Sequence, residues 1–114
     1  MRKHSAGVLF VTQPALWQPD IAPETDRLLW MGSVEGLPGM NNRGAYYSAA
    51  VLSRMLDRYN ETLLEFCREK GLECVDLAAR IPLTTEALYD DVHFNEAGAR
   101  MVAEVLADHL RRLK

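Results

Sequence analysis

The sequence predicts an α/β fold with parallel strands. Two short apolar runs, 7–11 and 72–77, have the composition of strands that are buried on both faces of a sheet. A segment with helical periodicity, 45–70, lies between them, and a second one, 95–113, follows them. Because parallel strands need a crossover connection, and a helix usually supplies it, the order strand, helix, strand, helix favours an α/β domain.

The composition limits the classes of partner. With 114 residues the chain is long enough for a single small domain, 1–114. A net charge of −3 argues against a nucleic-acid surface, which needs a clustered basic excess. No apolar run approaches the roughly 20 residues that span a bilayer, so no membrane partner is expected. The basic start of the chain precedes only a short apolar run without a small-residue cleavage site, which favours a strand over a signal peptide.

The two cysteines, Cys67 and Cys74, are too few for a disulfide framework and lack zinc-type spacing. We expect both to be small core residues, one on a helix and one on a strand. A reducing, cytoplasmic location is therefore expected, with secretion of a longer precursor left open. No metal and no other cofactor is expected.

The first strand, 7–11, ends at Pro14, and periodicity is then lost over a long loop, 15–44. A loop of this length in a compact domain is usually either functional or mobile. It contains both tryptophans, Trp17 and Trp30, and its stretch PETDRLLW has room for one short helix.

The helix predicted over 45–70 should end at Gly71, since glycine is the usual residue just past a helix. After the second strand, a loop over 82–94 leads to the last helix, for which Asn95 is a good N-cap. Two strands that are apolar on both faces need more neighbours than this chain supplies, so we expect it to be part of a larger sheet. The apolar face of the first long helix consists of Leu52, Leu56, Tyr59, Leu63, Phe66 and Cys67.

Acid–base chemistry is indicated in the loop that precedes the last helix, which reads YDDVHFNEAG over 89–98. A carboxylate that accepts a hydrogen bond from one imidazole nitrogen leaves the other nitrogen free to take a proton from a nucleophile. Asp90 and His93 are three residues apart in an irregular segment just before a helix, where both side chains can turn toward a cleft at the end of the sheet, the place where α/β folds bind ligands. The alternative is that these aspartates only cap the turn ahead of the helix.

The block DDVHFNEAG resembles the last conserved block of the SGNH (GDSL-like) hydrolases, in which Asp-x-x-His is followed by a polar N-cap and a glycine. The stretch GVLFVTQPALW is similar to the penultimate strand of that family, and YNETLLEFCREKGLECVDLAARI to its following helix and last strand. The resemblance covers nearly the whole chain. It implies part of a three-layer α/β/α sandwich of the flavodoxin-like type. The implied activity is metal-free hydrolysis of carboxylic esters, thioesters or acetyl groups by a serine.

The resemblance also implies roles for single residues. Asp90 would orient the imidazole and His93 would be the general base, whereas Asp91 would occupy a variable position and face solvent. Gly98 would let the last helix approach its neighbour closely, and Val92 and Phe94 would pack or line the pocket.

The long loop would then face an acyl or acetylated-sugar substrate. Its alternative is a self-packed loop whose aromatic residues cover the end of the sheet. The candidates for the pocket are Trp17, Trp30 and Phe94, together with Tyr46 or Tyr47.

The nucleophile and the oxyanion hole are missing from the match. The family takes both from blocks that precede the strand with which this chain begins. The GMN at 39–41 fits a Gly-x-Asn block but lies on the wrong side of that strand. Without an activated serine and oxyanion donors, the chain alone is predicted to be inactive. The four serines, which lie in no nucleophile-type turn, are Ser5, Ser33, Ser48 and Ser53.

Three explanations are open. The chain is a truncation of a hydrolase, which we favour because the Asp–His block is intact. It is a separately encoded half that completes a partner chain. Or it is a non-catalytic interaction module that self-associates through an exposed sheet edge.

Overall fold

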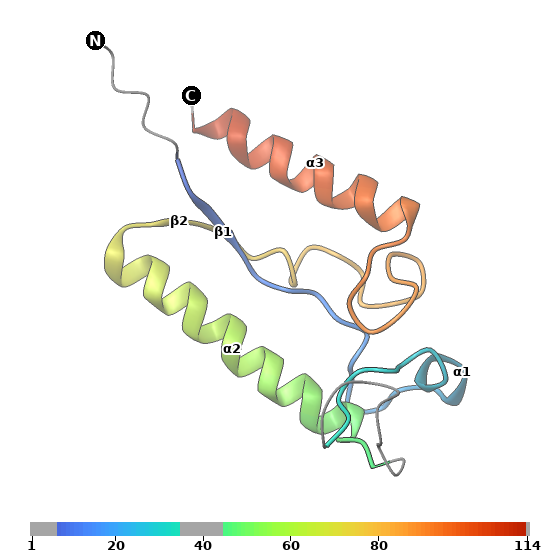
Figure 1. Cartoon of the computed structure of the whole chain (residues 1–114). Coiled ribbons are helices and arrows are strands. Elements are labelled where there is room, and N and C mark those ends of the chain that lie inside the picture. Colours follow the sequence, from blue (N-terminus) through green and yellow to red (C-terminus); the bar gives the residue numbers. More distant parts are fainter. Residues whose placement is uncertain (1–6, 35–44, 114) are drawn as a thin grey trace.

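The computed structural model describes residues 7–34 and 45–113 of the chain (Figure 1). Ser5 and the match at 39–41 therefore lie outside the described residues. The expected order of strand, helix, strand and helix is confirmed, and the stretch PETDRLLW does hold one short helix. The elements are β1 (Leu9–Val11), α1 (Pro23–Asp26), α2 (Ala49–Lys70), β2 (Glu73–Val75) and α3 (Glu96–Arg112).

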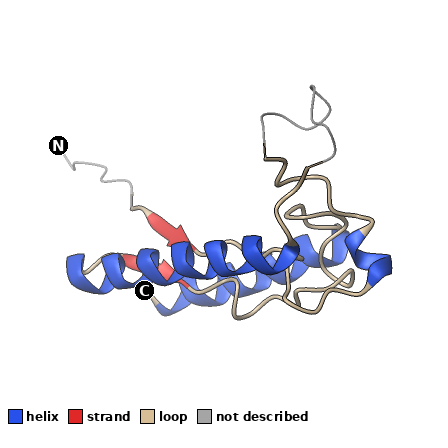
Figure 2. Cartoon of the chain, turned by 90° about the horizontal axis from the view of Figure 1, so that it is seen from below, coloured by secondary structure: helices blue, strands red, loops and turns tan. Residues whose placement is uncertain are grey.

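The two strands are parallel neighbours, with Leu9 opposite Glu73 and Val11 opposite Val75. Helix α2 lies on one side of this pair and α3 on the other (Figure 1). Seen from below, both long helices run alongside the strands, and the loops gather at one end of the molecule (Figure 2). The described residues thus form a mixed α/β fold with a two-stranded parallel sheet, as predicted.

Hydrogen bonds just past the strands hold their carboxyl ends together. Thr12 is fully buried, and its N–H donates to the carbonyl oxygen of Val75 over 3.1 Å. Its hydroxyl donates to Oδ1 of Asp76 over 2.8 Å and accepts the N–H of Ala78 over 2.9 Å. Because both the N–H and the hydroxyl of this buried threonine are paired, the two loops that follow the strands leave the sheet from fixed positions.

Helix α2 begins four residues later than predicted because Ser48 caps it, its hydroxyl accepting the N–H of Val51 over 3.3 Å. The helix ends where predicted, at Gly71, whose φ of 63° is in the left-handed region that favours glycine. Asn60, which is buried, bonds both the N–H and the C=O of Gln13 over 3.0 Å each. This side chain joins α2 to the segment that follows β1.

Helix α3 packs against the segment that follows β2. Asn95 caps it as predicted, its Oδ1 accepting the N–H of Gly98 over 2.8 Å. A Cβ at Gly98 would overlap the carbonyl oxygen of Ala87, so the expected close approach of this helix is confirmed. The core beneath α3 consists of Leu77, Ile81 and Ala87, against which Phe94, Met101, Val102 and Val105 pack.

The prediction that the strands are buried on both faces is wrong for the described chain. Val8 is 66% exposed and Val11 is 40% exposed. Tyr59 and Phe66, which belong to the predicted apolar face of α2, are 65% and 43% exposed. The reason is that two strands and two helices provide too little surface to cover all of these apolar groups.

Cys67 is buried on α2 and Cys74 lies on β2, as expected, but the two are not free cysteines, because a disulfide joins them. Their Cα atoms are 6.2 Å apart, within the range that a disulfide bridges. The bond ties the last turn of α2 to β2. Among the helices of the described ranges, none combines the length and the apolar content needed to cross a membrane.

Candidate active site

The loop that carries Asp90 and His93 is closed at its base. Leu88 and Phe94 form an isolated antiparallel bridge, and the N–H of Tyr89 donates to the carbonyl oxygen of His93 over 3.1 Å. One residue further out on each side, the N–H of Asn95 donates to the carbonyl oxygen of Ala87 over 2.9 Å. The loop therefore doubles back on itself, which brings the side chains of its two candidate residues together.

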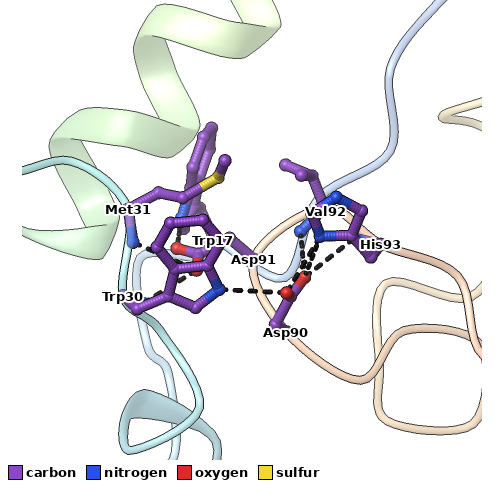
Figure 3. A network of polar contacts seen from close by, with 7 residues as sticks. All are labelled: Trp17, Trp30, Met31, Asp90, Asp91, Val92 and His93. Atoms are coloured by element: carbon purple, nitrogen blue, oxygen red, sulfur yellow. Dashed lines mark hydrogen bonds and ion pairs between the residues drawn. The ribbon is translucent and has the colours of Figure 1, made fainter. Parts of the chain in front are cut away.

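Asp90 and His93 are in direct contact (Figure 3). Nδ1 of the imidazole is 2.9 Å from Oδ2 of Asp90 and 3.0 Å from Oδ1. Oδ1 also accepts the main-chain N–H groups of Val92 and His93, over 3.1 and 2.9 Å. The carboxylate thus does both things that the sequence left open, since it caps the turn and also contacts the imidazole.

The contact assigns the proton of a neutral imidazole to Nδ1, because a carboxylate can only accept it. Nε2 is then left with a lone pair. The side chain of His93 is 51% exposed, and no residue in the described part of the chain bonds its Nε2. This arrangement can take a proton from an incoming group.

Asp90 is buried, and burial by itself would raise its pKa. Hydrogen bonds from the indole of Trp30, from the main chain and imidazole of His93 and from the N–H of Val92 have the opposite effect. Together they lower the pKa of Asp90 from 3.8 to about 2. The carboxylate is therefore ionised at neutral pH, as a group that stabilises an imidazolium must be.

Asp91 does not face solvent, contrary to what the resemblance implied. It is fully buried, and its carboxylate accepts the indole N–H of Trp17 over 2.8 Å. It also accepts the main-chain N–H groups of Trp30 and Met31, over 2.8 and 3.2 Å. The N–H of Leu16 donates to its carbonyl oxygen over 2.9 Å. Asp91 thus connects the candidate loop to both parts of the long loop.

The two tryptophans point their indole N–H groups at the two neighbouring carboxylates (Figure 3). Trp30 donates to Oδ2 of Asp90 over 3.0 Å, and Trp30 is 42% exposed. Trp17 donates to Asp91 and is only partly exposed. Both tryptophans were predicted to line the pocket. Nothing in the sequence indicated that they bond Asp90 and Asp91.

Tyr89 is a further neighbour that the sequence did not single out. Its ring stacks on the imidazole of His93 with 5.8 Å between the ring centres and 14° between the planes. The two rings meet because the loop doubles back on itself. The spacing of four residues in the sequence does not predict this stacking unless the path of the loop is known.

The remaining pocket candidates have different positions. Phe94 packs against the core beneath α3, which is the packing role that we considered for it. Trp17 lines a pocket of about 350 Å³ between the segment after β1 and helix α2. Tyr46 and Tyr47 line a larger pocket of about 590 Å³, between the region of α1 and the start of α2.

The described serines have places of their own. Ser48 caps α2, and Ser53 lies on that helix beside the pocket that Trp17 lines. Ser33 forms an isolated bridge with Tyr46. Over residues 7–34 and 45–113, no group of three or more His, Cys, Asp or Glu side chains is placed to hold a metal ion.

Comparisons with models of protein families, with curated proteins and with solved structures give no match for this chain.

Proposed function

We propose that this chain carries the acid–base part of an ester hydrolase of the SGNH type. The observation that carries the proposal is the contact between Asp90 and Nδ1 of His93, with the imidazole half-exposed beside it. A buried, ionised acid and an exposed imidazole that share a proton in this way are what a serine nucleophile requires. The Asp-x-x-His spacing and the polar cap that follows it agree with that family.

In the proposed reaction, Nε2 of His93 takes the proton of a serine hydroxyl as its oxygen attacks the ester carbonyl. Asp90 stabilises the imidazolium that forms. The imidazolium then gives the proton to the alcohol that leaves, and a water molecule releases the acid by the same steps in reverse order. The chemistry needs no metal or other cofactor, and its substrate class is a carboxylic ester or an acetylated sugar.

We place the serine and the oxyanion donors in a further part of the protein or in a partner chain. The position of α2 and α3 on opposite sides of β1 and β2 supports this, because additional strands beside β1 would extend the pair into a three-layer, flavodoxin-like sandwich (Figure 1). The exposed apolar groups of Val8, Val11 and Tyr59 would be covered by such an extension.

The test is hydrolysis of p-nitrophenyl acetate by the full-length gene product and by its variants. His93→Ala should lower kcat/KM at least about 100-fold, which is typical for loss of a general base. His109→Ala is the matched control, because His109 lies on α3 and bonds Glu73 rather than the candidate loop. Equal rates for the wild type and His93→Ala would reject the proposal.

A second experiment concerns the 114-residue chain by itself. Because its described serines are a helix cap, a helix residue and a bridge residue, we expect no labelling by a fluorophosphonate probe. Stoichiometric labelling would show that the chain does contain the nucleophile.

A second candidate function is a non-catalytic module that self-associates. It is favoured by β1, which in the described part of the chain pairs on one edge only, contains the exposed Val11 and directly follows the exposed Val8. Light scattering should then show dimers or larger species whose share rises with concentration, and Val8→Lys should reduce it. A chain that stays monomeric at high concentration would contradict this candidate.

A further inference from the structure

We propose that Trp30 is a positioning residue for the acid–base pair, holding the carboxylate of Asp90 in the orientation that receives the imidazole of His93. The proposal rests on the proposed function for its catalytic meaning. Its geometry and its test are independent of any ester hydrolysis.

Nδ1 of His93 lies within 3.0 Å of both oxygens of Asp90, and the two oxygens differ in their other donors. Oδ1 accepts the N–H groups of Val92 and His93, which belong to the same turn. Oδ2 accepts the indole N–H of Trp30 over 3.0 Å and lies 2.9 Å from Nδ1 of His93. Trp30 is therefore the donor from a distant part of the chain that fixes the rotation of this carboxylate.

Trp30 is itself fixed by the neighbouring carboxylate. Its main-chain N–H donates to Oδ1 of Asp91 over 2.8 Å, and the N–H of Met31 donates to the same oxygen. Asp91 is fully buried and is held by Trp17 as well. One tryptophan is thus joined to two successive carboxylates, through its main chain to Asp91 and through its side chain to Asp90 (Figure 3).

The arrangement has a chemical consequence at the imidazole. A carboxylate with a fixed rotation keeps the proton of neutral His93 on Nδ1, and a carboxylate that is free to turn does so only part of the time. Trp30 would therefore act on the tautomer of His93 without touching the imidazole.

The chain offers a matched pair of variants because it contains two tryptophans, each of which donates its indole N–H to one of the two aspartates. Trp30→Phe removes the bond to Asp90, and Trp17→Phe removes the bond to Asp91. ¹⁵N NMR of the histidine ring reports the tautomer directly. In the 114-residue chain, at a pH where the imidazole is neutral, we expect the Nδ1–H form to predominate for His93.

Trp30→Phe should lower the share of the Nδ1–H tautomer toward the minor share that a free histidine shows, and Trp17→Phe should leave it unchanged. An unchanged tautomer in folded Trp30→Phe would overturn the proposal. An equal loss in both variants would also overturn it, because it would show a merely structural effect.

A second measurement decides the matter if Trp30→Phe does not fold. The two indole N–H signals of the chain are assigned, and Asp90→Asn is compared with the wild type. The signal of Trp30 should shift upfield, since a neutral amide is a weaker acceptor than a carboxylate, and that of Trp17 should stay in place. A shift of neither signal, or of the Trp17 signal alone, would overturn the proposal. Because these readouts need no substrate, they can fail while the hydrolase proposal holds, and the reverse is also true.

Discussion

Gly98 lies against the carbonyl oxygen of Ala87, with no room for a side chain between them. Ala87 is fully buried, and the same carbonyl oxygen accepts the N–H of Asn95 over 2.9 Å. The first turn of α3 therefore packs directly on Ala87, the residue at which the candidate loop begins. The close approach sets the position of both ends of that loop.

We predict that Gly98→Ala destabilises the protein. Its Cβ would meet backbone rather than a movable side chain, so α3 must shift, at a cost of about 1–3 kcal/mol in the free energy of unfolding. Urea denaturation measures this. Gly7→Ala is the control, because a Cβ there would have no atom within 4 Å. Equal midpoints for Gly98→Ala and the wild type would show that the contact between Gly98 and Ala87 does accommodate a methyl group.

We predict that Asp91→Ala is more damaging than an exposed substitution of the same kind. It leaves three N–H donors without their acceptor in a buried place, at a cost of about 3 kcal/mol or more in the free energy of unfolding. Asp57→Ala, on the exposed side of α2, should change this quantity by less than about 0.5 kcal/mol. Thermal or urea unfolding compares the two, and similar small effects would mean that Asp91 is not the buried acceptor described.

The stability of the protein should depend on Asp90 in acid. The pKa of Asp90 is about 2 in the folded protein, whereas an unperturbed aspartate, as in the unfolded chain, has a pKa of 3.8. The ionised carboxylate therefore stabilises the fold. This contribution, about 2 kcal/mol, is fully present above about pH 4 and is lost as the pH falls through 2. The difference in unfolding free energy between the wild type and Asp90→Asn should therefore shrink over that range. A difference that stays constant with pH would contradict the lowered pKa.

The disulfide should contribute to stability. It closes a short loop, since its cysteines are seven residues apart, and chain entropy predicts about 2–3 kcal/mol for a loop of this size. Dithiothreitol should lower the urea midpoint of the wild type by a corresponding amount. The double variant Cys67→Ser, Cys74→Ser should not respond to the reductant. Alkylation of both cysteines in the native, unreduced protein would show that the bond is not formed.

The elements were readable from the sequence because their signals are local. Helical periodicity, the stop at Gly71 and the cap at Asn95 depend on residues within one turn of each other. The contact between Asp90 and His93 was also predictable, since three residues separate them and the turn that joins them is short.

The partners of the candidate pair were not readable in the same way. Trp30 and Asp91 are 61 residues apart, and nothing in either segment indicates that a main-chain N–H of one would meet the carboxylate of the other. The fate of Tyr59 and Phe66 was missed for a related reason. Periodicity identifies an apolar face, and whether that face is covered depends on elements elsewhere in space.

The bridge between Leu88 and Phe94, with the bonds from Tyr89 and Asn95 on either side of it, joins the two ends of the loop 87–95 to each other. Asp90 and His93 both lie between these bonded ends. A transplant of this loop between a strand and a helix of another protein should keep the path of its main chain, but the orientation of Asp90 would be kept only in a host that also supplies an indole N–H in the place of Trp30. The backbone of the loop is therefore a local product, whereas the alignment of its acid is a long-range one.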